Sequence, residues 1–210
     1  MYAQIFEPLT VVIDAGHGGN DQGAHGKTLY EKDVVLRIAL ALAALLKDEV
    51  KVVLTRDADV SLGLRERVNL ANEAHANLFV SIHANAYPDP EAHGIETYYL
   101  DVTNDQYALK LATRENLLSE GSEAELKFIL ADLSAKEFTA ESLSLAEAVQ
   151  KQVIRELRMD YKETRDLGVK RSLFYVLLGV KMPAVLVETS FLSNPNEHAL
   201  LGKEQYIQAI

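Results

Sequence analysis

The sequence contains no cysteine, which excludes disulfide bonds and thiolate metal sites. This absence fits any cellular compartment and therefore decides none. Basic residues are also in the minority, because 21 Lys and Arg stand against 31 Asp and Glu, for a net charge of −10. A nucleic-acid-binding protein normally shows a basic stripe, and an anionic membrane surface attracts basic segments. The charge balance therefore argues against both kinds of partner.

Long apolar runs are missing as well. No stretch approaches the ~18 apolar residues that a membrane span requires, so we expect no membrane insertion. The first residues, MYAQIFEPLT, show neither the basic nor the apolar region of a signal peptide. With 210 residues and a hydrophobic content of 48%, the chain can bury a large core. We expect a single domain over residues 1–210.

Short apolar runs alternate with amphipathic stretches along the chain. This pattern predicts strands over 11–15, 50–55, 78–83, 94–100, 173–178 and 184–187, and helices over 31–46, 65–76, 145–157 and from about 196. The alternation favours an α/β sheet covered by helices on both faces. Residues 104–144 depart from it, because they are rich in Glu, Lys, Ala and Leu and are too long for an ordinary connection. We interpret them as a helical insertion on the surface.

Three of the predicted strands end in a residue that can bind a metal or move a proton. The runs are VVIDAGH, ending at His17, LFVSIH, ending at His83, and AVLVE, ending at Glu188. In an open α/β sheet the carboxyl ends of the strands face one crevice, so these side chains are expected to meet. Glu31 precedes Val34 by three residues and therefore shares the face of its helix that packs on the core.

Each of these four residues also has an ordinary structural explanation. His17 can be a turn histidine bonded to the backbone, and His83 a core histidine. Glu31 can interact with the helix start, and Glu188 can form a buried salt bridge. All four explanations would have to hold separately, whereas one zinc site accounts for them together. Two histidines and a glutamate are a common zinc set for hydrolysis, with a further carboxylate as base and then acid, and Glu188 is the candidate for that role.

Five motifs resemble, in order, those of the zinc-dependent N-acetylmuramoyl-L-alanine amidases. They are VVIDAGHGGNDQGA, YEKDVVL, LGLRERVNLAN, LFVSIHANA and PAVLVETSFLSNPNE, and they span nearly the whole chain. The resemblance implies a mixed, mostly parallel sheet of six strands and a peptidoglycan substrate, cleaved at the amide between the lactyl group of N-acetylmuramic acid and L-alanine. It also implies Zn²⁺ bound by His17, Glu31 and His83, a catalytic Glu188, and a periplasmic or otherwise extracytoplasmic location. Ala15 stands where the family often has proline, a departure that touches no ligand.

The insertion resembles a helical segment of Gram-negative cell-division amidases. In those enzymes the segment blocks the zinc cleft until an activator protein of the LytM type displaces it. The resemblance implies autoinhibition, an activator partner and a role in daughter-cell separation. It makes Glu115 the candidate for an additional ligand that plugs the metal, although a glutamate in a charged helix commonly lies on a solvated face.

Two other functions remain open from the sequence. A zinc carboxypeptidase acting on stem peptides would use a similar ligand set, because ligands alone do not fix the scissile bond. A non-catalytic wall-binding module is a further alternative, and the presence of Glu188 argues against it.

Three more polar residues near the motifs have less specific roles. We expect Asp14 either to support a ligand or to make a buried hydrogen bond. Arg67, on an early helix, is expected to pair at the surface. Asn85 is expected to cap a turn or to touch the substrate.

Overall fold

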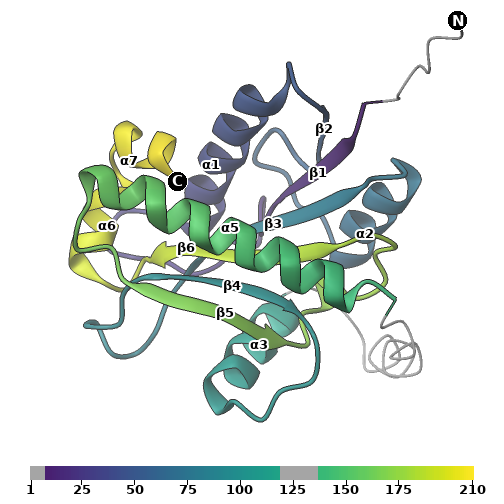
Figure 1. The fold of residues 1–210 in the computed structure, drawn as a ribbon. Helices are drawn as coiled ribbons and strands as arrows, with labels where there is room; N and C mark the ends of the chain where they lie inside the picture. Colours follow the sequence, from purple (N-terminus) through teal and green to yellow (C-terminus); the bar gives the residue numbers. More distant parts are fainter. Residues whose placement is uncertain (1–7, 119–136) are drawn as a thin grey trace, which may run out of the picture.

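The computed structural model describes residues 8–118 and 137–210. Its centre is a six-stranded sheet with the strand order β2-β1-β3-β6-β4-β5 (Figure 1). The strands are β1 (Thr10–Ala15), β2 (Lys51–Leu54), β3 (Leu78–Asn85), β4 (Ile95–Leu100), β5 (Asp166–Ser172) and β6 (Ala184–Phe191). β4 runs antiparallel to β6, and every other neighbouring pair is parallel. The prediction of a mixed, mostly parallel α/β sheet is confirmed.

Helices cover both faces of the sheet. One core cluster joins the sheet to α1 (Glu31–Leu46), α5 (Thr139–Asp160), α6 (Pro195–Leu201) and α7 (Glu204–Ala209). The other joins it to α2 (Leu64–Glu73), α3 (Gln106–Leu118) and the short 3-10 helix η1 (Tyr175–Leu177). In Figure 1, α5 crosses in front of the sheet while α3 lies beneath β4 and β5.

The sequence explains these elements through burial. Every residue of β1 and β6 is buried, as expected for continuous apolar runs between two helical layers. Helix α1 buries Val34, Val35 and Ile38 at helical spacing, and Glu31 and Asp33 place negative charge in its first turn, where the helix dipole favours it. The continuous burial of β1 and β6 and the spacing of the buried residues on α1 both agree with the pattern predicted from the sequence.

The predicted strand over 173–178 is wrong. The strand β5 ends at Ser172, and the residues that follow include η1. Phe174, just before η1, and Val176 and Leu177 within it are buried in the core. A run of apolar residues signals burial, but it does not by itself fix the backbone conformation. The predicted last helix is likewise two short helices, α6 and α7, separated at Gly202 and Lys203.

The predicted insertion is helical at both of its described ends. It begins with α3, and its last residues belong to α5, which starts at Thr139 and is longer than the predicted helix. Residues 119–136 lie outside the described part of the chain, so the extent of the insertion stays a prediction. Within the described residues, no helix has both the length and the apolar character of a membrane span.

Candidate metal centre

Four buried side chains converge at the carboxyl ends of β1 and β3. His17 follows β1, Glu31 begins α1, His83 lies on β3 and Glu115 lies on α3. Each offers one ligand atom, and these atoms all lie within 4.8 Å of one another. The structure therefore brings together the three predicted ligands and the candidate fourth residue.

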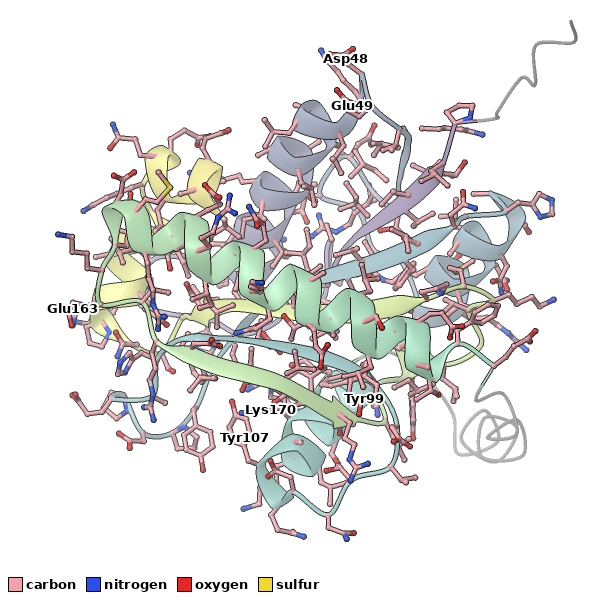
Figure 2. All side chains as sticks on the ribbon, viewed as in Figure 1. Asp48, Glu49, Tyr99, Tyr107, Glu163 and Lys170 are labelled. Carbon is pink, nitrogen blue, oxygen red and sulfur yellow. The ribbon has the colours of Figure 1, made fainter. Side chains whose placement is uncertain are left out.

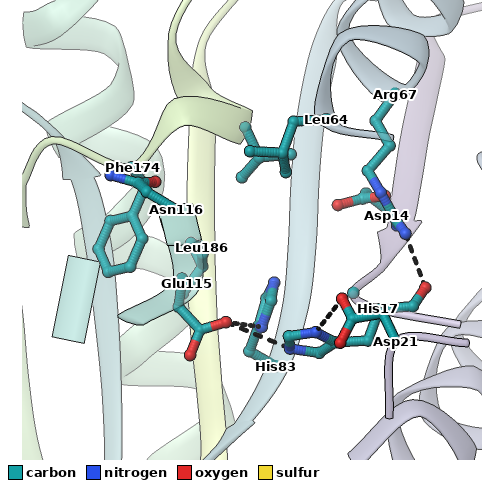
Figure 3. A pocket seen from close by; sticks show the side chains of 12 residues that line it. Asp14, His17, Asp21, Leu64, Arg67, His83, Glu115, Asn116, Phe174 and Leu186 are labelled. Atoms are coloured by element: carbon teal, nitrogen blue, oxygen red, sulfur yellow. Dashed lines mark hydrogen bonds and ion pairs between the residues drawn. The ribbon is translucent and has the colours of Figure 1, made fainter. Parts of the chain in front are cut away.

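The spacing of the ligand atoms is close to that around a small tetrahedral ion. His17 Nε2 lies 3.2 Å from Glu31 Oε1 and 3.2 Å from Glu115 Oε2. His83 Nδ1 lies 3.0 Å from the same Glu31 oxygen. It also lies 3.4 Å from the same Glu115 oxygen, and Figure 3 shows Glu115 beside both histidines. Zinc–ligand bonds of about 2.0–2.2 Å in a tetrahedron place the ligand atoms roughly 3.3–3.6 Å apart. In addition, His17 Nε2 has no hydrogen-bond partner among the described residues. These residues fit a zinc ion.

The orientation of His17 is set by its other ring nitrogen. His17 Nδ1 and the Asp21 carboxylate are 2.8 Å apart, so Nε2 faces the cluster. A carboxylate partner of this kind commonly orients a metal-binding imidazole. Asp21 was not identified from the sequence, although its position four residues after His17 in the same glycine-rich loop is the signal that could have found it.

Glu31 is held by backbone groups from two directions. Its Oε2 accepts a hydrogen bond from Ala24 N at 2.7 Å, and its Oε1 accepts one from Ala84 N at 3.0 Å. These N–H groups belong to the loop and to β3, so a helix-start interaction does not account for the buried position of Glu31. Its carboxylate is fixed with one oxygen toward both histidines.

The carboxylates make the centre attractive to a cation. Burial alone would lower the pKa of His83, but the adjacent Glu115 and Glu31 carboxylates outweigh it and raise the pKa to about 10. Burial would raise the pKa of Glu31, yet His17 and His83 hold it below its ordinary value. Both shifts show a strong local preference for positive charge beside these oxygens.

Glu188 lies beside the cluster on β6, at the position paired with His83 in the parallel ladder. Its side chain is fully buried, and neither carboxylate oxygen has a hydrogen-bond partner among the described residues. The buried salt bridge considered for Glu188 is therefore not formed within that part of the chain. Burial raises the pKa of Glu188 well above its ordinary value, so this environment favours the protonated carboxyl group.

Glu115 does not lie on a solvated face, since only 6% of it is exposed. Arg114 Nε and Nη2 donate to Glu115 Oε1 at 3.0 and 2.8 Å, leaving Oε2 toward the histidines. Arg114 also donates to Ala86 O and to Asn85 Oδ1, just past His83. The neighbouring arginine thus fastens α3 to the end of β3.

A second polar cluster fixes the start of α3. Glu96 of β4 is fully buried and accepts hydrogen bonds from Asn85 Nδ2 and Tyr107 Oη, and it forms an ion pair with Lys170. Lys170 Nζ also lies 4.6 Å from the centre of the Tyr107 ring, and Figure 2 shows these two residues beside α3 and β5. Asn85 therefore joins α3 to the sheet rather than capping a turn.

The cluster opens into a pocket with one polar and one apolar side. His17, His83 and Glu115 form the polar side, and Leu64, Phe174 and Leu186 contribute to the apolar wall (Figure 3). His17, His83 and Glu115 therefore face a small, partly enclosed space.

Comparisons with known proteins found a matching family, similar sequences and a similar structure. The family profile described as N-acetylmuramoyl-L-alanine amidase matches residues 11–210. The chain is 35% identical to the amidase AmiA of Escherichia coli, over 95% of this chain and 71% of AmiA. It is 37% identical to the amidase LytC of Bacillus subtilis, over 94% of this chain and 32% of LytC. An N-acetylmuramoyl-L-alanine amidase structure from Clostridium difficile 630 is 32% identical, with a TM-score of 0.75, over 97% of this chain and 91% of that one.

Proposed function

This chain belongs to the N-acetylmuramoyl-L-alanine amidase family, and from that premise we propose which residues carry out its hydrolysis of peptidoglycan. The bond cleaved is the amide between the lactyl group of N-acetylmuramic acid and L-alanine of the stem peptide. His17, Glu31 and His83 hold a zinc ion, and Glu188 is the catalytic carboxylate. The observation that carries the proposal is the convergence of four buried ligand atoms within 4.8 Å.

A zinc ion held by these residues would supply a Lewis acid that activates water and polarises the scissile carbonyl group. Glu188 accepts a proton from the attacking water as the oxygen bonds to the lactyl carbonyl carbon. It then returns the proton to the alanine nitrogen as the C–N bond breaks. The products are a lactyl carboxylate on the glycan and a free amino group on the stem peptide. The buried position of Glu188 beside His83 supports this role.

We extend the proposal to regulation through α3. Catalytic zinc sites keep one position open, whereas sites with four protein ligands are generally structural. Glu115 supplies a fourth ligand atom and is held by Arg114, so α3 closes the centre and autoinhibits the enzyme. Activity then requires an activator protein of the LytM type to displace α3. This control fits an extracytoplasmic enzyme that separates daughter cells, because an open wall hydrolase would endanger its own cell.

Digestion of purified peptidoglycan tests the proposed reaction. The zinc content of the protein is measured first, and the parent and Glu115→Ala are then incubated with peptidoglycan, with and without a chelator. We expect about one zinc per chain, and mass spectrometry should find glycan strands without peptides together with stem peptides that begin with free L-alanine. Chelation should abolish the release, and added zinc should restore it.

The reaction products also distinguish the amidase from the alternative, a zinc carboxypeptidase. Release of terminal amino acids from stem peptides that stay attached to the glycan would identify a carboxypeptidase. Hydrolysis that continues after complete removal of the metal would contradict the proposed zinc centre.

A further inference from the structure

The loop that carries His17 has an unusual backbone conformation. His17 has φ of +57°, in the left-handed region that side chains other than glycine rarely adopt. Such a conformation persists only where the surroundings hold it in place. The contacts that hold this loop therefore help to fix the position of the His17 imidazole.

Two buried arginines hold the loop by its carbonyl groups. Arg67 of α2 donates from Nη1 to Ala15 O and from Nη2 to His17 O, both at 2.6 Å. Arg56, which follows β2, donates from Nε to Ala15 O at 2.9 Å and from Nη2 to Gly16 O at 2.8 Å. Three consecutive carbonyl groups are thus bound by two guanidinium groups. We call Arg56 and Arg67 the arginine clamp.

The clamp is itself fixed in the core. Arg67 Nη1 also lies 2.7 Å from Asp14 Oδ1, and Asp14 accepts hydrogen bonds from Thr55 and Ser81, each at 2.7 Å. Asp14 is fully buried and Arg67 is only 3% exposed. The expectation that Arg67 pairs at the surface is therefore wrong. Arg67 lies on the buried face of α2, where the Asp14 carboxylate and the loop carbonyl groups provide partners for its guanidinium group.

The backbone of this loop sets the positions of two imidazole rings, those of His17 and His83. Figure 3 shows Arg67 reaching the backbone oxygen of His17 while the His17 ring faces His83 and Glu115. A Cβ atom on Gly16 would lie 2.5 Å from His83 Cε1, so the backbone at Gly16 packs directly against the His83 ring. A small shift of this backbone would therefore move His17 Nε2 and, at the same time, change the packing of Gly16 against the His83 ring.

We propose that Arg67 and Arg56 are positioning residues that hold His17 in its left-handed conformation and thereby set the affinity of the centre for zinc. The inference rests on the proposed metal site. Arg67 and Arg56 act through the backbone of residues 15–17 and do not touch the metal. A guanidinium group suits this task because its planar array of donors binds two carbonyl groups at once, which an ammonium group does not do with the same geometry.

Arg67→Lys tests the proposal, because lysine keeps the positive charge beside Asp14 and removes the two-carbonyl contact. Zinc affinity is measured with Zn²⁺ alone, in competition with a fluorescent chelator, for the parent, Arg67→Lys and the control Arg65→Lys. Arg65 lies on the exposed face of the same helix. We expect the affinity of Arg67→Lys to fall roughly 10- to 100-fold, the range known for residues that support metal ligands. Arg65→Lys should bind like the parent.

Two further measurements separate positioning from a general loss of stability. The melting temperature of the metal-free protein reports folding, and the visible spectrum of the Co²⁺-substituted protein reports the geometry of the ligands. Positioning predicts a weakened affinity and an altered spectrum in a variant that is folded before zinc is added. A folded Arg67→Lys that binds zinc with parental affinity would overturn the inference.

Arg56→Lys provides the second variant, since it leaves the Asp14–Arg67 pair intact and loosens Ala15 O and Gly16 O. It decides the question if Arg67→Lys does not fold, and parental affinity in Arg56→Lys would then overturn the inference. A parent protein that binds no zinc at all gives a different result, because it overturns the proposed metal site and this inference with it.

Discussion

Asp14 and Glu188 lie toward the carboxyl ends of two parallel strands, β1 and β6, and both are fully buried, but their surroundings are opposite. Asp14 receives hydrogen bonds from Arg67, Thr55 and Ser81. Burial would raise its pKa, and these partners together hold the pKa below the ordinary value. Glu188 has no hydrogen-bond partner among the described residues, and burial raises its pKa well above the ordinary value.

This difference in hydrogen bonding distinguishes a buried carboxylate that stabilises the fold from one that is available for chemistry. A carboxylate that accepts hydrogen bonds from three partners, one of them a cation, is stabilised in its charged form and so resists taking up a proton. A buried carboxylate without partners destabilises the fold, and that cost is typical of functional sites. Glu197 is intermediate, because among the described residues its two oxygens accept hydrogen bonds from two backbone N–H groups, Gly94 at 2.8 Å and Phe191 at 2.6 Å.

The largest expected effect is on catalysis and follows from Glu188→Gln. Glutamine has nearly the same shape but cannot accept and return a proton, so turnover of peptidoglycan should fall roughly 10²- to 10⁴-fold. The free energy of unfolding should stay at the parental value or rise, because no buried charge needs to be accommodated. Rates of stem-peptide release, zinc content and urea denaturation measure these effects.

Glu147→Gln, an exposed change on α5, is the matched control and should leave all three quantities unchanged. Parental turnover in Glu188→Gln would remove Glu188 from the mechanism.

The corresponding change at the other carboxylate is Asp14→Asn. Its main effect should be on the free energy of unfolding, whereas the main effect of Glu188→Gln is on turnover. Asp14→Asn leaves the Arg67 guanidinium buried without its counter-charge, and breaking a buried pair in this way costs about 3–5 kcal/mol. Urea denaturation of the metal-free protein measures the loss, with Asp48→Asn in the exposed turn after α1 as the control. A loss below about 0.5 kcal/mol, the range of ordinary surface changes, would mean that the loop carbonyls alone satisfy Arg67.

The contribution of Glu197 to the free energy of unfolding should depend on pH. Burial raises its pKa from 4.5 to about 7, against the two backbone hydrogen bonds. Because the folded pKa lies above the unfolded one, Glu197 favours the folded state most below pH 4.5, and this contribution is lost as the pH rises to 7. The loss is at most roughly 3 kcal/mol, from 1.36 kcal/mol per pKa unit.

The measurement is the free energy of unfolding of the parent minus that of Glu197→Gln, at several pH values from 4.5 to 8. This difference should fall as the pH rises, and the other titrating groups cancel in it. Glu204→Gln is the control, since its exposed carboxyl has a lowered pKa and should give a small change of the opposite sign. A difference that stays constant across the window would show that the two N–H groups fully compensate for burial.

The sequence allowed the ligand-bearing elements to be predicted because burial and spacing are local signals. Apolar runs that end in His17, His83 and Glu188 located three strand ends, and the spacing from Glu31 to Ile38 located the buried face of α1. The apolar residues 173–178 misled the same reasoning, because a 3-10 helix buries side chains as well as a strand does.

The supporting contacts could not be predicted in this way. Arg67 and Asp14 are 53 positions apart, and the hydrogen bonds from Arg56 to the loop depend on a backbone conformation that no residue pattern specifies. Asp21 carried a usable signal in its spacing from His17, whereas Arg67 had the pattern of an ordinary helix surface. Long-range partners of a charge become visible only when the fold brings the elements together.

The smallest expected effect concerns Glu115, a carboxylate shared between Arg114 and the two histidines. If this residue closes the centre, Glu115→Ala should raise basal turnover by about ten-fold, a change of about 1.4 kcal/mol in the activation barrier. Zinc content should stay near one per chain, because His17, Glu31 and His83 remain. Stem-peptide release without any activator protein measures the effect, and Lys110→Ala on the exposed side of α3 is the control.

The direction of the change distinguishes the two roles that the geometry allows for Glu115. A blocking ligand lowers activity while it is present, so its removal opens a position for water and turnover rises. A ligand or positioning group that the reaction needs would give a fall in turnover instead, with the zinc content as a check that the centre is still loaded. No change in fully zinc-loaded Glu115→Ala would remove autoinhibition by α3, whereas a fall would remove it and make Glu115 a second carboxylate, beside Glu188, that the reaction needs.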